Sequence, residues 1–194
     1  FDVTQSNQPT KLALSHGGTI VRVQGGDAWA VTRQQLTRGT GSFSFELIGD
    51  KSGDEISCFG VVNESHLGAL PLAMHEVKAP AGSCYLRSYN GKVADASFSA
   101  TDDACKLHPG GTTRMDVDLM AGTATFYVNG RRHPLIARGV RGPVRGFVYS
   151  YSSSGATVLE ARGLAFAGGD NAPVGGLVDP HILEEAKKQL VGLR

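Results

Sequence analysis

Five arginines lie close together late in the chain: Arg131, Arg132, Arg138, Arg141 and Arg145. A guanidinium group binds a carboxylate or a phosphate through two parallel hydrogen bonds. The cluster can therefore bind an acidic peptide or the phosphates of an RNA. Glycines beside Arg138 and Arg141 leave the backbone open between the two side chains, so we take this pair as candidate binding residues. The alternative is a solvated surface balanced by acidic residues elsewhere.

A second candidate site contains Arg87, Tyr89 and Asn90. Arginine and aromatic residues dominate the energetics of protein interfaces, so this segment could contact a short peptide. Asn90-Gly91 also predicts a type I′ turn, and the alternative is a plain hairpin with partly buried tyrosines. Trp29 is the only tryptophan, and it either anchors a ligand at a loop or packs in the core or at its rim.

Catalytic chemistry has little support in the residue pattern. The sequence contains no Gly-x-Ser-x-Gly, phosphate-binding Gly-Lys-Ser/Thr or HExxH motif. Asp116 and Asp118 fall on one side of a predicted strand, where a structural role is favoured over a catalytic pair. One connection holds potential metal ligands whose spacing defines no tetrahedral site: Glu64, His66, His75 and Glu76. We predict a protein that is not an enzyme and holds no metal or cofactor.

Composition limits the class of protein. The chain has 194 residues, 41% of them hydrophobic, and a net charge of +1, which does not favour a strongly nucleic-acid-binding protein. Three irregularly spaced cysteines, Cys58, Cys84 and Cys105, form no disulfide framework and favour a reducing compartment. No stretch reaches the roughly 20 apolar residues that span a bilayer, so no membrane partner is expected.

These features predict an intracellular protein, most simply a cytoplasmic one. The chain begins at Phe1 rather than Met, so we expect a segment upstream that is absent here, either a targeting segment or a further domain. If that segment was a targeting sequence, the protein would reside in an organelle instead.

Alternating residues predict many short strands. Phe43, Phe45 and Leu47 share one face of a strand over 42–47, and two hairpins are expected over 113–134. The apolar run 56–62 is typical of a strand covered on both sides. Residues 1–10 are expected to be an extended lead-in, and residues 92–111 are a polar stretch. Ten to twelve strands without intervening helices predict an all-β, antiparallel two-sheet sandwich.

The C-terminal region differs from the sandwich. A glycine-rich linker is predicted over 166–178, followed by an amphipathic helix over 179–194 that begins at Asp179-Pro180. Its apolar face either packs on its own domain or docks on a partner. The long connection over 63–82 offers the same choice, because its leucines either meet a partner or cover the core.

The order of motifs resembles the SPRY/B30.2 family over roughly residues 10–165. The strongest similarity is the segment from Asp118 to Asn129-Gly130, supported by Phe43–Leu47, Phe59–Val62 and the turn Ser88–Gly91. Phe45 stands where the family usually has tryptophan, and Gly110-Gly111-Thr112 lacks the family's Asp, so the chain looks like a divergent member. The resemblance implies a concanavalin-like jelly roll over residues 1–165.

The resemblance also implies a function. It suggests a protein-interaction module, often part of a ubiquitin-ligase or scaffold assembly, whose ligand sits on loops at one end of the sandwich. Tyr89 and Arg87 would lie beside a binding turn. We therefore expect a protein or peptide partner. The alternatives are an RNA-associated subunit that uses Arg131–Arg145, and a lectin or hydrolase on a similar sandwich.

Overall fold

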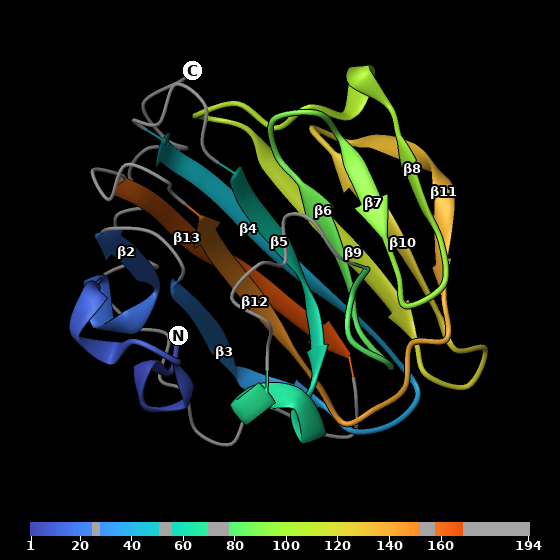
Figure 1. The fold of residues 1–194 in the computed structure, drawn as a ribbon, viewed down its shortest axis with the longest axis horizontal. Helices are drawn as coiled ribbons and strands as arrows, with labels where there is room; N and C mark the ends of the chain where they lie inside the picture. The colour runs from blue at the N-terminus through green and yellow to red at the C-terminus, as the bar shows by residue number, and fades with distance from the viewer. Residues whose placement is uncertain (25–27, 51–55, 70–77, 152–157, 169–194) are drawn as a thin grey trace, which may run out of the picture.

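The computed structural model describes residues 1–24, 28–50, 56–69, 78–151 and 158–168. These residues form two stacked antiparallel sheets, as predicted (Figure 1). Short 3-10 turns join or precede the strands: η1 (Val3–Gln5), η2 (Pro9–Lys11), η3 (His16–Gly18), η4 (Glu64–Ala69) and η5 (Asp103–Cys105). Within the described residues, no helix is long and apolar enough to cross a membrane.

The first sheet has six strands and is called sheet A. In spatial order its strands are β3 (Ala28–Leu36), β12 (Val144–Tyr151), β5 (Ile56–Asn63), β6 (Cys84–Arg87), β7 (Lys92–Ala94) and β8 (Ser99–Thr101). Its strands are joined by antiparallel pairing throughout, including Val144 opposite both Leu36 and Asn63.

The second sheet has seven strands and is called sheet B. In spatial order its strands are β1 (Leu12–Ser15), β2 (Ile20–Gln24), β13 (Val158–Gly168), β4 (Thr40–Asp50), β9 (Thr112–Asp118), β10 (Thr123–Val128) and β11 (Arg131–Arg138). The last strand of the described chain, β13, lies between β2 and β4.

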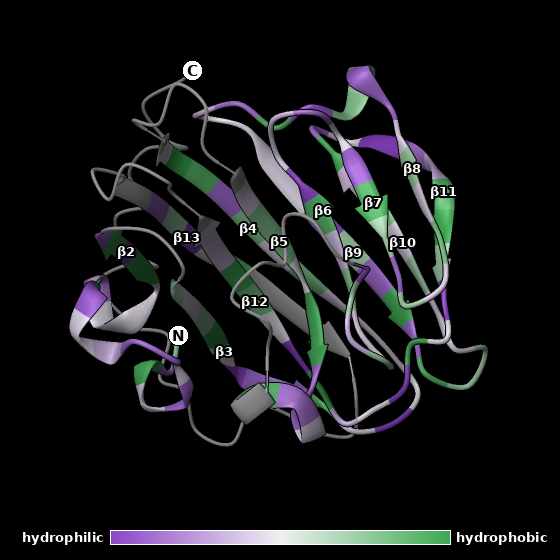
Figure 2. Ribbon diagram, viewed as in Figure 1, coloured by the Kyte–Doolittle hydropathy of each residue, from purple (hydrophilic) through white to green (hydrophobic). Residues whose placement is uncertain are grey.

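The main core lies between the two sheets and follows the alternation in the sequence. Phe43, Phe45 and Leu47 are each 1% exposed, and inward residues of β9 and β10 are equally buried. Figure 2 shows hydrophobic residues recurring along the strands, with hydrophilic residues between them. Because period-2 alternation puts one face of each strand in the core, the strand predictions for 42–47 and 113–128 are confirmed.

The outer face of sheet A is buried as well. Trp29, Cys58, Tyr85 and Tyr149 form a second apolar cluster on this face, each exposed by 1% or less. The prediction that residues 56–62 form a strand covered on both sides is confirmed, because Phe59 and Val61 face the main core and Cys58 and Val62 the second cluster.

Three segments differ from what the sequence pattern suggested. Residues 1–11 contain two 3-10 turns, and Phe1 stacks on Phe45 with ring centroids 6.0 Å apart. The polar stretch 92–111 contains β7, β8 and η5, whose strands of three residues are too short to show a period. β13 extends to Gly168, beyond residue 165 where the sandwich was predicted to end. The remainder of the predicted linker and the predicted helix 179–194 lie outside the described residues.

The two Asn-Gly turns differ from each other. Asn129 and Gly130 both have positive φ, at 49° and 79°, and join β10 to β11 as a type I′ turn requires. Between β6 and β7 the loop has four residues, 88–91, and only Gly91 has a positive φ there, at 63°. The type I′ prediction for Asn90-Gly91 was therefore wrong, because Arg87 pairs with Lys92 and the turn begins two residues earlier than the dipeptide suggests.

Candidate functional site

The predicted binding residues lie at opposite ends of the sandwich. Strands β6 and β7 meet at the turn 88–91, which carries Tyr89 and Asn90 at the end drawn uppermost in Figure 1. Arg138 ends β11 and Arg141 lies in the following loop, at the lower end in the same view. One ligand site therefore cannot contain all of the predicted residues, and the two ends are described separately as the upper end and the lower end.

The lower end is built from loops that hold one another in place. The loop 139–143 is central, since Val140 N–H donates to the Gly122 carbonyl at 3.1 Å and Arg141 N–H to the Gly82 carbonyl at 3.2 Å. Asn63 Nδ2 donates to the Arg141 carbonyl at 2.6 Å. Val140 is fully buried and anchors the loop in the core. The Val140 contact joins the loop 119–122 to the loop 139–143, and Asp95 joins the loop 95–98 to Arg138 at the end of β11. These three loops are here called the lower platform.

Asp95 is the polar centre of the lower platform and is only 2% exposed. Its Oδ1 accepts hydrogen bonds from the backbone N–H groups of Ser97 and Phe98 and from the Ser97 hydroxyl. Its Oδ2 accepts from the backbone N–H of Arg138 at 2.8 Å. Burial alone raises the pKa of Asp95, but the hydrogen bonds outweigh it and hold the pKa below its ordinary value. Asp95 thus joins two loops that are distant in sequence.

The lower platform exposes side chains typical of protein interfaces. Met120 is 86% exposed and Phe98 is 57% exposed. The exposed arginines Arg138 and Arg141 lie on the strand end and loop that contact both of these turns. Of the ion pairs in the described part of the chain, none includes Arg138 or Arg141. Aromatic residues, methionine and arginine are enriched at interface cores, so this surface is suited to a protein partner.

The upper end presents a different arrangement. Arg87 is only 7% exposed, whereas Tyr89 is 49% exposed. Arg87 Nη1 donates to the Tyr89 hydroxyl at 3.3 Å, and the guanidinium carbon lies 5.7 Å from the centre of the Tyr89 ring. Asn90 Oδ1 accepts from the Lys92 backbone N–H at 3.1 Å, which fixes the turn. Tyr89 is the accessible residue of this group, and Arg87 lies beneath it.

Trp29 lies in the second apolar cluster with 1% of its surface exposed. Its backbone is paired with Tyr149 of β12. This position fits core packing, the alternative to ligand binding that the sequence left open for Trp29.

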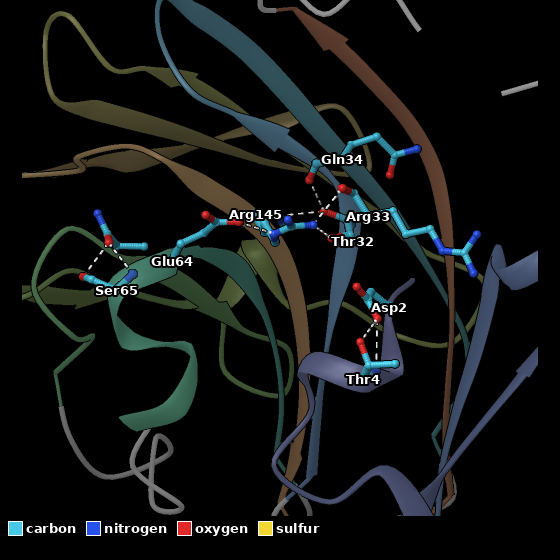
Figure 3. Close-up of polar contacts among 10 residues, drawn as sticks. Asp2, Thr4, Thr32, Arg33, Gln34, Glu64, Ser65 and Arg145 are labelled. Carbon is cyan, nitrogen blue, oxygen red and sulfur yellow. Dashed lines mark hydrogen bonds and ion pairs between the residues drawn. The ribbon is translucent and has the colours of Figure 1, made fainter. Parts of the chain in front are cut away.

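The five clustered arginines do not form one site. Arg131 and Arg138 are at opposite ends of β11, about 23 Å apart for a strand of eight residues. Arg131 pairs with Asp102 at 3.5 Å. Arg145 Nε pairs with Glu64 at 2.5 Å, and Arg145 Nη1 donates to the carbonyls of Thr32 and Arg33 (Figure 3). Arg145 therefore holds β12 to β3 and η4.

The remaining groups that could do chemistry are engaged in structure. Asp118 Oδ1 accepts from the backbone N–H groups of Met120 and Ala121, and Asp116 pairs with Arg114 at 3.0 Å. Cys58, Cys84 and Cys105 are buried and form no disulfide bonds. Burial raises the pKa of the Cys58 thiol to about 12. Such a thiol is protonated and a poor nucleophile at neutral pH. Across the described ranges, no group of three or more His, Cys, Asp or Glu could hold a metal ion.

Several residues of the lower platform were missed by reasoning from the sequence: Phe98, Met120 and Asp95. A local signal existed for Asp95, because an aspartate two residues before a serine is typical of an Asx turn. Its contact with Arg138 spans 43 positions in the sequence, so the local sequence pattern could not predict it.

Comparison with known proteins supports the fold. No protein-family profile matches the sequence, and no curated protein matches it either. Among solved structures, the SPRY domain of human HERC1 has a TM-score of 0.61 at 19% identity, covering 84% of this chain and 96% of that domain. A second human SPRY domain has a TM-score of 0.55 at 15% identity, covering 79% of this chain and 94% of that one.

The PSpry domain of TRIM65 is also similar, with a TM-score of 0.50 at 14% identity and coverage of 80% and 86% of the two chains. The structural resemblance predicted from the motif order is therefore confirmed, at sequence identities that are low throughout.

Proposed function

We propose that this chain, which has the fold of SPRY domains, is a non-catalytic module that binds a protein partner through its lower platform. The observation that carries the proposal is the exposure of Phe98 and Met120 on turns that the 138–143 segment joins through hydrogen bonds. A large apolar side chain that is mostly exposed on a fixed turn loses little conformational entropy when a partner covers it.

The charges of the lower platform favour a partner with acidic groups. Arg138 and Arg141 are exposed, and the carboxylates at this end accept hydrogen bonds from backbone N–H groups, Asp95 from Arg138 and Asp118 from the loop 119–122. Exposed arginines of this kind steer an acidic partner and contribute to hot spots. Membership of a larger assembly, such as a ubiquitin ligase or a scaffold, remains a prediction from the family resemblance.

An RNA partner is less well supported. Phosphate binding along a groove requires several cations in one row. The arginines that were predicted to form such a group are spread over both ends of β11, and Arg145 is engaged by Glu64 and two carbonyl groups. RNA binding is therefore the alternative that the nuclease treatment in the following experiment tests.

The double variant Met120→Ser/Arg138→Glu is expected to lose its protein partners while remaining folded. Both side chains are exposed, so their replacement removes interface contacts without disturbing the core. Hot-spot residues contribute enough that affinity should fall by about 30-fold or more. The measurement is quantitative affinity purification of the full-length protein from its own cells, with and without nuclease, followed by titration of the most enriched partner.

Arg132→Glu is the matched control, because Arg132 is an exposed arginine on the same strand as Arg138 but at the upper end. It should retain the same partners. Equal retention of every partner by the double variant would contradict the proposed surface. Loss of all partners after nuclease treatment would favour the RNA alternative.

A further inference from the structure

Arg87 is a buried cation whose hydrogen-bonding capacity is largely unused. Although the residue is only 7% exposed, Nε and Nη2 are buried and have no hydrogen-bond partner. Nη1 donates to the Tyr89 hydroxyl at 3.3 Å, and the guanidinium also lies near the Cys58 thiol and the Tyr85 hydroxyl, where it offsets part of the rise that burial causes in the pKa of each. Leaving charged donors unsatisfied inside a protein is costly, which makes this arrangement informative.

The two unused nitrogens belong to the same edge of the guanidinium group. Nε–H and one N–H of Nη2 point in parallel and form the fork that binds both oxygens of a carboxylate. The engaged atom, Nη1, lies on the opposite side, so the contact with Tyr89 leaves the fork complete. The free groups are therefore a matched pair suited to a planar, two-oxygen anion.

The neighbours of Arg87 add positive charge and supply no acid. Cys58 and Lys92 are its partners on the adjacent strands, so their side chains emerge on the same outer face of sheet A. Burial, followed by repulsion from Arg87, lowers the pKa of Lys92. Among the described residues, no ion pair includes Arg87 or Lys92. Two adjacent cations that form no ion pair within the described ranges attract an anion.

We propose that Arg87, assisted by Lys92 and Tyr89, binds a carboxylate side chain of an acidic peptide at the upper end. Tyr89 is half exposed and its ring lies over the guanidinium, with the guanidinium carbon 5.7 Å from the ring centre, so rotation of the Tyr89 side chain would uncover this face of the guanidinium for an incoming group. This upper site is separate from the lower platform, and its test does not depend on the proposed function.

A carboxylate is favoured over a phosphate by shape and surroundings. The fork offers two parallel donors, which a carboxylate satisfies completely, whereas a phosphate has further charged oxygens that need additional donors. The buried neighbours on the outer face, Cys58 and Tyr85, are neutral at pH 7, since burial raises the pKa of each to about 12. They add no charge of their own, so the site is suited to a single planar anion.

The test uses an acetylated and amidated hexaglutamate peptide as the probe and a hexaglutamine peptide as its neutral match. The Arg87 Nε–Hε resonance of the ¹⁵N-labelled protein should shift saturably with hexaglutamate and stay unchanged with hexaglutamine. Arg87→Lys should weaken binding by about 30-fold, because an ammonium group cannot form the two-pronged contact. Arg22→Met, which removes an exposed arginine from sheet B, should bind as the wild type does.

A second readout separates binding from a structural role. Without ligand, Arg87→Met should raise the melting temperature by about 4 °C, because it removes an unpaired buried charge and keeps the side-chain volume. A comparable fall in the melting temperature would show that the chain itself satisfies Arg87, and would overturn the proposal.

No shift of the Arg87 resonance, or an equal shift with decauridylate RNA, would also overturn it. Met120→Ser/Arg138→Glu should still bind hexaglutamate, so failure at one end is distinguishable from failure at the other.

Discussion

Gly60→Ala is expected to destabilise the domain by about 3 kcal/mol or more and to leave most of the expressed protein insoluble. Gly60 lies in the middle of β5, between Phe147 of β12 and Tyr85 of β6. A Cβ at this position would lie 2.2 Å from the Cys84 carbonyl oxygen and 2.8 Å from the Tyr85 Cα. Both obstacles are backbone atoms of a central strand, so the sheet itself would have to separate.

Gly49→Ala is the matched control, because Gly49 also lies in a strand and a Cβ there meets nothing within 4 Å. Urea denaturation of the two variants, followed by tryptophan fluorescence, gives the comparison. Trp29 reports on sheet A directly, since it is buried on β3. A Gly60→Ala midpoint equal to that of Gly49→Ala would show that sheet A tolerates the extra atom, contrary to the contacts described.

Asp95→Ala is expected to cost about 2 to 4 kcal/mol of unfolding free energy and to abolish partner binding at the lower platform. The substitution leaves the N–H groups of Ser97, Phe98 and Arg138 without their acceptor. Met120→Ser/Arg138→Glu should lose binding alone, whereas Asp95→Ala should lose binding and stability together. Chemical denaturation at pH 7, combined with the partner titration, measures both quantities.

The Asp95 contribution also predicts a pH dependence. The hydrogen bonds hold the folded-state pKa below the unfolded value of about 3.9, so the stabilisation is fully present above that pH. It is lost as the pH falls through the folded-state pKa. Denaturation between pH 7 and pH 2.5 should therefore show a steeper loss of stability below about pH 4 for the wild type than for Asp95→Ala.

Asp103→Ala provides the control for both experiments on Asp95. The Asp103 side chain is 79% exposed and pairs only with the nearby Lys106, so its removal should leave the denaturation midpoint and its pH dependence unchanged. Identical acid profiles of Asp95→Ala and the wild type would show that Asp95 is not the group responsible for the acid loss.

The strands of the sandwich were predictable because burial of one face makes apolar and polar residues alternate along each strand. Phe43–Phe45–Leu47 and the hairpins of 113–128 follow this rule directly. The rule fails where a strand is too short to show a period, as in β7 and β8, whose position depends on pairing with β6. It also cannot place a turn when the dipeptide Asn90-Gly91 lies at the end of a longer loop.

The grouping of the candidate site residues was less predictable, because sequence proximity is a poor guide to proximity at the ends of a sandwich. Arg131 and Arg138 are seven positions apart and face opposite ends, since both lie on one extended strand. Asp95 and Arg138 meet across 43 positions. The type of residue was informative, as arginines do occupy both ends, but the grouping of those residues required the paired strands.

The place of β13 between β2 and β4 has a consequence for synthesis of the protein. Until residues 158–168 have left the ribosome, the facing edges of β2 and β4 have no partner within sheet B. Open strand edges recruit other chains, so a nascent or truncated chain that ends before Val158 would be prone to aggregation. The domain should therefore depend on chaperones until β13 has been synthesised, and its folding should be slow for its size because residues as distant as Ile20 and Arg162 must pair.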